Sequence, residues 1–200
     1  MQMELLSGDL ENLISKRHKI LNDEEIIENW FKQLAQGIFY LHKNGIIHLD
    51  IKTKNILYSK DMNTLKLTDL GHSKQTNFES LYSVGNHGSI LYLPPEIDIT
   101  SILPKKYKSS FDIWCFGIVI YQILSKSDQN TFGFENLRET LKSKPNYLFE
   151  KLKGKNSKFL FVCNSCLQIK PEKRPKIEDV IKMLELPSNH STFQSNCILQ

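Results

Sequence analysis

The chain has 200 residues, 40% of them hydrophobic and 24% charged, which is the composition of a globular domain with one core. The net charge of +4 comes from lysines spread along the sequence, a pattern typical of a solvated surface and not of a nucleic-acid-binding patch. No apolar run approaches the ~20 residues that a membrane-spanning helix needs, and we expect no signal peptide.

The four cysteines are too few for a disulfide scaffold in a chain of this length. Cys163 and Cys166 form a single C-x-x-C motif with no second pair and no histidine nearby, so a zinc site is not expected at this motif. We therefore expect a reduced, intracellular protein with partly buried thiols, most simply a cytoplasmic one.

Two helices are predicted in the first quarter of the chain. The first is short and covers residues 10–14, where apolar residues recur at helical spacing. The second begins at a capping box formed by Asn22 and Glu25, and it ends at Gly45. Its apolar residues form one stripe, which we expect to face the core: Ile27, Trp30, Phe31, Leu34, Ile38 and Leu41.

Short strands and polar loops follow this helix. Residues 46–57 read as a short strand, a polar loop and a second short strand. Residues 65–68 alternate as a strand does, and residues 60–63 form the turn before them. The polar loop and the end of the last strand should therefore meet at one end of a small sheet.

Four side chains at that end form a set suited to phosphoryl transfer. Asp50 is a carboxylate that could take a proton, and Lys52 is a cation two residues later. Asn55 and Asp69 supply the hard oxygen ligands that hold Mg²⁺ against substrate phosphates. Positioning and charge neutralisation do most of the catalysis in such reactions.

The second half of the chain is predicted to be mainly helical. Residues 72–87 are polar and aperiodic, which predicts a loop. Residues 113–124 are apolar nearly all round the helix, with Gln122 as the one polar break, so this helix should be buried. Three further helices are separated by prolines and cover residues 134–143, 157–168 and 176–186.

Five short motifs follow one another at plausible intervals. They are H-L-D-I-K-T-K-N at 48–55, D-L-G at 69–71, G-S-I-L-Y-L-P-P-E at 88–96, D-I-W-C-F-G at 112–117 and P-E-K-R-P at 171–175. In this order they resemble the signatures of eukaryotic-type protein kinases of the serine/threonine type. Its departures from those signatures include Leu49 for arginine, Leu70 for phenylalanine and Pro94 for alanine.

The resemblance implies a fold that is mainly α with small β-hairpins, an α+β class. It corresponds to the large C-terminal lobe of a protein kinase, with the small N-terminal lobe absent. Residues 1–7 would be a hinge remnant and residues 8–186 the lobe itself, with the catalytic loop at 48–55 and the activation segment at 69–96. We expect residues 187–200, which are polar, to be a disordered tail.

The resemblance also assigns a role to each candidate catalytic residue. Asp50 would orient the substrate hydroxyl and accept its proton, while Lys52 would contact the γ-phosphate of ATP. Asn55 and Asp69 would hold Mg²⁺ against the phosphates. His48 is expected to be a packed structural residue.

The remaining nucleotide contacts and the partners follow from the same resemblance. Backbone groups of Glu4 and Leu6 would meet the adenine, and Leu57 would form part of the apolar floor beneath it. The implied cofactors are ATP and Mg²⁺, and the implied partner is a protein substrate, with no nucleic acid. A membrane becomes a partner only if Cys197, in the C-terminal C-I-L-Q, is prenylated; the alternative is an ordinary tail.

Structural and regulatory contacts are implied as well. Asp112 would accept N–H groups of the catalytic loop, and Arg174 would pair with Glu96. Leu49 cannot pair with an activation-segment phosphate as an arginine would, so control through that contact is not expected. Lys54 would repel a basic residue upstream of the target hydroxyl.

The activation segment offers four candidate phosphoacceptors, each of which could equally be ordinary loop polarity: Ser73, Thr76, Ser80 and Ser83.

Two functions from different classes fit these features. The first is a serine/threonine kinase, here in a truncated form. The second is a non-catalytic C-lobe or pseudokinase that binds partners through its helical face. The 200 residues contain no glycine-rich loop and no lysine strand before residue 8, so we expect the isolated chain to transfer phosphate weakly or not at all.

Overall fold

The structure is a computed structural model that describes residues 6–76, 79–80, 90–97, 105–106, 108–126, 137–144 and 146–188. Its α-helices are α1 (Leu10–Ser15), α2 (Glu24–Lys43), α3 (Ser110–Ser125), α4 (Leu137–Ser143), α5 (Tyr147–Lys151), α6 (Ser157–Cys166) and α7 (Ile177–Glu185). Its 3₁₀ helices are η1 (Lys19–Asn22), η2 (Thr53–Asn55), η3 (Leu70–His72), η4 (Ile90–Tyr92) and η5 (Pro171–Lys173). The expectations for Glu4, Ser83 and Cys197 lie outside the described residues.

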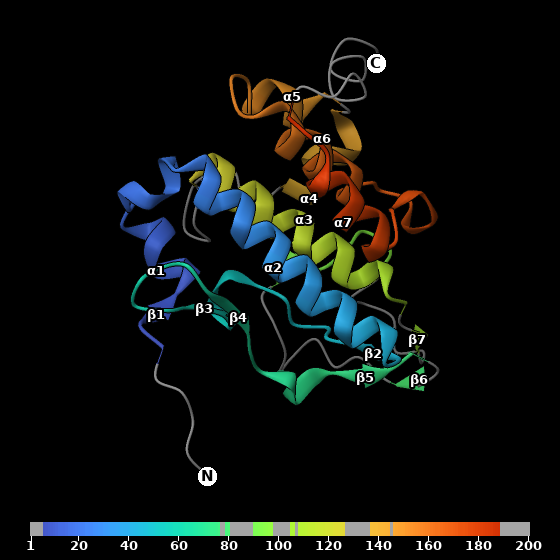
Figure 1. The fold of residues 1–200 in the computed structure, drawn as a ribbon. Coiled ribbons are helices and arrows are strands. Elements are labelled where there is room, and N and C mark those ends of the chain that lie inside the picture. Colours follow the sequence, from blue (N-terminus) through green and yellow to red (C-terminus); the bar gives the residue numbers. More distant parts are fainter. Residues whose placement is uncertain are drawn as a thin grey trace.

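The strands are short and antiparallel, and the sequence predicted those that flank the loop at 48–55 and the one that begins at Leu65. They are β1 (Gly8–Asp9), β2 (Ile46–Ile47), β3 (Ile56–Tyr58), β4 (Leu65–Leu67), β5 (Lys74–Gln75), β6 (Glu79–Ser80) and β7 (Lys105–Lys106). Three of them form a sheet in the order β1-β3-β4, while β2 pairs with β5 and β6 pairs with β7. In Figure 1 the strands lie below α2 and α3, and α5, α6 and α7 lie above these two helices. The described part of the chain is thus mostly helical with small β-pairs.

Helix α2 is amphipathic and stops where predicted, but its cap differs from the prediction. The predicted apolar stripe is buried, and Gly45 adopts a positive φ of 69° after the helix. The N-cap is Asp23, whose side chain accepts a hydrogen bond from the Ile26 amide at 3.1 Å. Asn22 was the wrong choice because its side chain contacts Lys19 and the Lys126 ammonium instead.

Polar side chains of α2 hold the β3–β4 hairpin. Trp30 Nε1 donates to the Met62 carbonyl at 2.7 Å, and Gln33 Nε2 donates to the Asn63 carbonyl at 2.7 Å. Gln33 Oε1 accepts from the Leu65 amide at 2.9 Å, at the start of β4. The turn predicted at 60–63 is therefore confirmed, and α2 fixes the strand that leads to Asp69.

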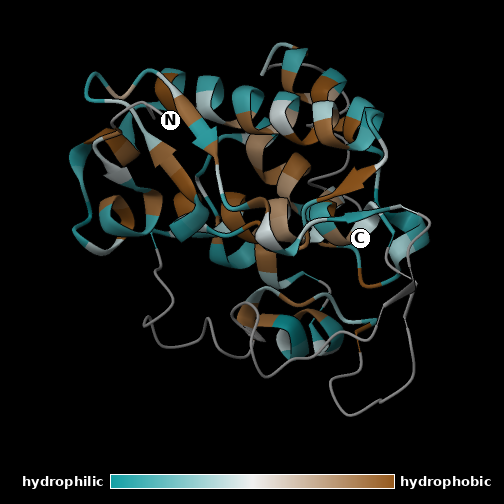
Figure 2. Cartoon of the chain, turned by 90° about the horizontal axis from the view of Figure 1, so that it is seen from below, coloured by the Kyte–Doolittle hydropathy of each residue, from teal (hydrophilic) through white to brown (hydrophobic). Residues whose placement is uncertain are grey.

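Helix α3 runs through the middle of the core. Every residue from Phe111 to Leu124 is buried, which confirms the predicted all-round apolar helix. Figure 2 shows the central helix in hydrophobic colours, while the long outer helix along the upper edge alternates with hydrophilic turns. A Cβ at Gly117 would lie 2.8 Å from Cys166 Cβ and 2.8 Å from Leu167 Cγ, so the close approach of α3 to α6 requires glycine here.

Some predicted elements differ in extent from those observed. The loop predicted at 72–87 contains β5 and β6, and α5 was not predicted at all. The predicted helices at 134–143, 157–168 and 176–186 correspond to α4, α6 and α7, of which the last two are shorter. Two-residue strands and a five-residue helix carry too little periodicity for a sequence pattern to reveal them.

The cysteines within the described residues are Cys115, Cys163 and Cys166, and all three are free and buried. Burial raises the pKa of the Cys166 thiol to about 12, so the C-x-x-C pair is protonated and packed into the core. In the described part of the chain, no helix combines the length and apolar character needed to cross a bilayer.

The predicted pair between Arg174 and Glu96 is present and bidentate. Arg174 Nη1 and Nη2 each donate to a Glu96 carboxylate oxygen at 2.7 Å. The Arg174 side chain is fully buried, whereas that of Glu96 keeps 28% of its surface exposed. The guanidinium also donates to three backbone carbonyls and lies 5.0 Å from the centre of the Trp114 ring.

Glu96→Ala should lower the free energy of unfolding by about 3 kcal/mol, because it leaves the buried Arg174 guanidinium without a counter-charge. Urea denaturation followed by circular dichroism measures this change. Glu172→Ala, an exposed glutamate close to Arg174 in sequence, is the matched control and should change stability by less than about 0.5 kcal/mol. Equal effects of the two variants would contradict a structural role for the pair.

Candidate active site

The candidate site begins at the loop between β2 and η2. His48 is fully buried, as expected of a packed residue. Its Nδ1 accepts a hydrogen bond from the Asp50 amide at 3.3 Å, so Nε2 carries the proton and donates to the Thr68 carbonyl at 3.1 Å. The imidazole ring thus joins the loop to the segment that follows β4.

Asp112, in the first turn of α3, holds the start of this loop. Its carboxylate accepts hydrogen bonds from the His48 amide at 2.8 Å and from the Leu49 amide at 3.0 Å, which confirms the expected contact. Asp112 also has a third partner that was not predicted. His42 Nε2, at the end of α2, lies 2.8 Å from Asp112 Oδ2. In the sequence, His42 follows Ile38 by four residues, which places it on the apolar face of α2. This position was the available signal for a buried histidine.

The three contacts surround a fully buried carboxylate, and the helix N-terminus adds favourable partial positive charge. They also support an uncommon backbone conformation. Leu49 has a φ of 64°, in the left-handed region that costs a residue with a Cβ about 1–2 kcal/mol. The Leu49 side chain is buried in the core, where it replaces the arginine of the family signature.

Asp50 is the meeting point of two other predicted site residues. Lys52 Nζ donates to its two carboxylate oxygens at 2.9 and 2.8 Å. Asn55 Nδ2 donates to Asp50 Oδ2 at 2.8 Å and to the Asp50 carbonyl at 2.9 Å. Two residues within five positions of Asp50 therefore hold its buried carboxylate.

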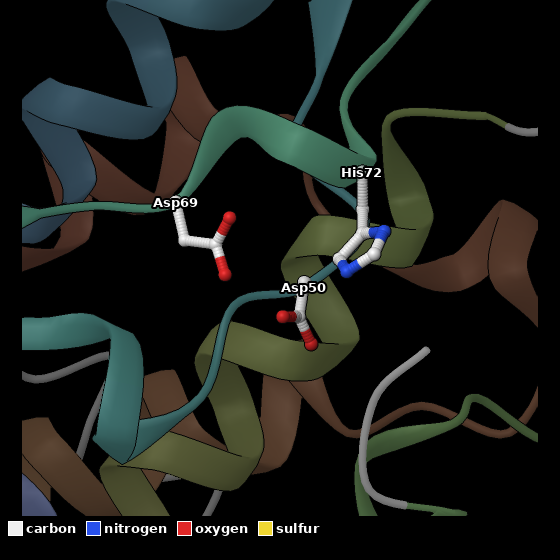
Figure 3. Close-up of side chains that lie close together, drawn as sticks. All are labelled: Asp50, Asp69 and His72. Atoms are coloured by element: carbon white, nitrogen blue, oxygen red, sulfur yellow. The ribbon is translucent and has the colours of Figure 1, made fainter. Parts of the chain in front are cut away.

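Asp69 lies beside this group. The Thr68 amide donates to the Asn55 carbonyl at 2.9 Å, which sets the register of the two segments. Asp69 itself has a φ of 66° and caps η3, accepting from the Gly71 amide at 3.2 Å. Ligand atoms of Asp50, Asp69 and His72 all lie within 4.8 Å of one another, and Figure 3 shows the three side chains facing one another. The four predicted residues thus come together, with His72 as an unforeseen neighbour.

Of the two described residues predicted to contact adenine, Leu57 lies in β3 and Leu6 lies two residues before β1. The Ser7 amide, next to Leu6, donates to the Tyr58 carbonyl at 2.9 Å, and Leu57 pairs with Asp9 of β1. Leu6 and Leu57 are each half-buried, so apolar surface is available at this edge.

A second set of buried contacts, which was not predicted from the sequence, anchors the far end of the loop. Thr53 Oγ1 donates to the Glu11 carboxylate and lies 2.9 Å from the Tyr92 hydroxyl. The Tyr92 hydroxyl donates to Gln122 Oε1 at 2.5 Å, and burial raises the pKa of Tyr92 well above its ordinary value. The signal in the sequence was Gln122, the one polar residue in an otherwise apolar helix.

The donor atoms of the site fit a divalent cation such as Mg²⁺. The Asn55 amide nitrogen is occupied by Asp50, which leaves Asn55 Oδ1 as the possible ligand atom. Asp69 Oδ2 accepts no hydrogen bond from the residues that the structure describes. Two carboxylates and one ammonium give a net charge of −1 around the site, which favours a hard cation with oxygen ligands.

Comparison with known proteins gives one family. The family model described as the protein kinase domain matches residues 1–184. The chain is 38% identical over 126 residues to the probable serine/threonine-protein kinase fhkB of Dictyostelium discoideum, covering 62% of this chain and 11% of that protein. It is 30% identical over 176 residues to the human serine/threonine-protein kinase Nek5, covering 88% of this chain and 24% of that protein.

A third relative carries a different description. The seven transmembrane domain-containing tyrosine-protein kinase 1 of Dictyostelium discoideum is 28% identical over 192 residues, covering 89% of this chain and 26% of that protein. The chain therefore spans between 11% and 26% of the length of these three relatives.

Asp112→Asn should free one of the two loop amides, because an amide side chain has one acceptor oxygen where the carboxylate has two. We expect the amide protons of His48 and Leu49 to exchange with solvent at least about tenfold faster, as measured by NMR hydrogen exchange. His42→Phe removes only the third contact and should give a smaller increase. Asp179→Asn on α7 is the control, and equal exchange in it and in Asp112→Asn would contradict the anchoring role.

Proposed function

The chain belongs to the eukaryotic-type protein kinase family, and we propose that it transfers the γ-phosphate of ATP to serine or threonine hydroxyls of protein substrates. The observation that carries this proposal is the convergence of Asp50, Lys52 and Asn55 within hydrogen-bonding distance, with Asp69 beside them. An N-cap or turn role would explain one aspartate but not this combination.

In the proposed reaction, Asp50 orients the substrate hydroxyl and accepts its proton as the oxygen attacks the γ-phosphorus. Its position is fixed before substrate arrives, since Asn55 and Lys52 already hold both carboxylate oxygens. The Lys52 ammonium, 2.8 Å from that carboxylate, can turn to the γ-phosphate and offset charge on the oxygens of the transferred group.

The nucleotide would be held by the neighbouring residues. Asn55 Oδ1 and Asp69 would hold Mg²⁺, which when bound neutralises charge on the phosphates. Leu57 would lie beneath the adenine, and backbone groups of Leu6 and Glu4 would meet its edge. The described half-buried leucines on the β1–β3 side of the sheet support this placement.

Two sequence features support a serine or threonine acceptor over tyrosine. Lys52 follows Asp50 by two residues, and Gly88-Ser89 precedes Tyr92, as in serine/threonine kinases. The names of the relatives include both acceptor classes, so the choice is left to experiment. A non-catalytic binding module is the alternative, and the same experiment separates the two.

The full natural protein that carries these residues should phosphorylate serine peptides in the presence of Mg²⁺ and ATP. Asp50→Asn and Lys52→Met should each lower kcat by at least about 100-fold, because they remove the proton acceptor and the phosphate-facing cation. Radiolabelled phosphate transfer measures these rates. Asp179→Asn and Lys60→Met are the matched controls, made at surface positions of α7 and of the β3–β4 turn.

Transfer that survives in both site variants would exclude the proposed mechanism. A preference for tyrosine peptides would exclude the proposed acceptor class. No transfer by the correctly folded wild-type protein would support the binding-module alternative.

Lys54 should disfavour basic residues upstream of the acceptor, because its exposed ammonium lies on the same loop as Asp50 and Lys52. Lys54→Glu reverses the charge and should raise selection for upstream arginine by about fivefold in a peptide-library assay, since exposed charge pairs contribute up to about 1 kcal/mol. Lys60→Glu is the control for net charge. Strong upstream arginine selection by the wild type would overturn this prediction.

A further inference from the structure

His72 has no role in the proposed phosphoryl transfer, yet it faces both carboxylates of the site. Ligand atoms of Asp50, Asp69 and His72 lie within 4.8 Å of one another, and the three side chains come from two separate segments (Figure 3). We propose that these three residues form a binding site for a first-row transition-metal ion such as Zn²⁺.

The local backbone explains why Asp69 and His72 face the same space. Asp69 is the N-cap of η3, and His72 is its last residue, three positions further on. Figure 3 shows that the two side chains point into the same space. Asp50 then approaches from the opposite segment, where Lys52 and Asn55 hold it in place.

The donor set distinguishes this site from one for Mg²⁺ alone. Magnesium prefers oxygen ligands and keeps several waters, whereas an imidazole nitrogen suits zinc, copper, iron and nickel. Two carboxylates with one histidine are three protein ligands, the number found at zinc sites that keep a further position open. His72 therefore shifts the preference of the site toward transition metals.

The carboxylate atoms have capacity for such an ion. Asp50 Oδ1 accepts a hydrogen bond from Lys52 alone among the described residues, and a carboxylate oxygen has two acceptor sites. Asp69 uses Oδ1 for the Gly71 amide, which leaves Oδ2 facing the site. Two ligand atoms of a tetrahedral zinc ion lie about 3.3 Å apart, so side-chain rotations that bring the three groups about 1.5 Å closer would complete the site.

Lys52 sets an upper limit on the affinity. Its ammonium lies 2.9 Å and 2.8 Å from the two Asp50 oxygens and offsets one of the two negative charges. We expect a dissociation constant of roughly micromolar order, weaker than that of a closed structural zinc site. If the proposed kinase function is correct, on which this consequence alone rests, an ion bound here occupies Asp50 and inhibits phosphate transfer.

Isothermal titration of Zn²⁺ into the purified protein, without nucleotide or Mg²⁺, tests the site independently of activity. We expect His72→Ala to weaken zinc binding at least about tenfold and Asp69→Asn to weaken it similarly, while His72→Ala leaves Mg²⁺ binding unchanged. His18→Asn is the matched histidine control. The asparagine keeps an acceptor for the Ile20 amide. His18 lies before the start of α2, whereas His72 lies before β5, whose partner strand β2 follows the end of α2.

X-ray absorption at the zinc edge of the wild-type protein gives a second readout that does not depend on a variant. One imidazole with oxygen ligands and no sulfur is expected. Sulfur in the coordination shell, or equal zinc affinity in His72→Ala and His18→Asn, would overturn the proposal. A full natural protein that binds zinc in this way but transfers no phosphate would refute the kinase function and leave the metal site standing.

Discussion

The buried carboxylate of Asp112 is the interaction on which the candidate site depends. Removing a carboxylate from water costs several kcal/mol, and here three donors converge on it to offset that cost. Two of those donors are consecutive amides of the loop between β2 and η2, which includes the left-handed Leu49. The strands that flank this loop have two and three residues, too few to fix its conformation by themselves.

Helix α3 fixes the loop at both ends. Asp112 holds residues 48 and 49, and Gln122 acts through the Tyr92 hydroxyl on Thr53. These two anchors are ten residues apart on one helix, or about 15 Å along its axis. Asp50 and Lys52 lie between the anchored points, so their positions are set by the buried helix α3 and not by contacts at the surface of the molecule. Such preorganisation is what catalysis by positioning requires.

The proximity of the candidate site residues was predictable from the sequence because they lie at short, fixed offsets. Asp50, Lys52 and Asn55 occupy one loop, and Asp69 follows the next strand, so local patterns were sufficient. The apolar stripe of α2 was readable for the same reason.

Features that depend on distant contacts were not readable in this way. Asn22 lost the cap of α2 to Asp23 because Lys126, far along the chain, contacts its side chain. His42 contacts Asp112, 70 positions away, and Glu11 contacts Thr53, 42 positions away. Neither contact can be read from the local sequence. The position of His72 opposite Asp50 required the packing of two loops, which no periodicity encodes.

Gly117 couples the packing of α3 against α6 to the salt bridge between Arg174 and Glu96. The absence of a side chain there lets α6 approach α3 until Cys166 and Leu167 nearly touch its backbone. The carbonyls of Gln168 and Ile169, just beyond that contact, accept hydrogen bonds from Arg174. One added methyl group at position 117 would therefore push away the end of α6 and, with it, two of the oxygens that solvate the guanidinium. The buried ion pair between Arg174 and Glu96 is thus sensitive to the volume of a residue it never contacts.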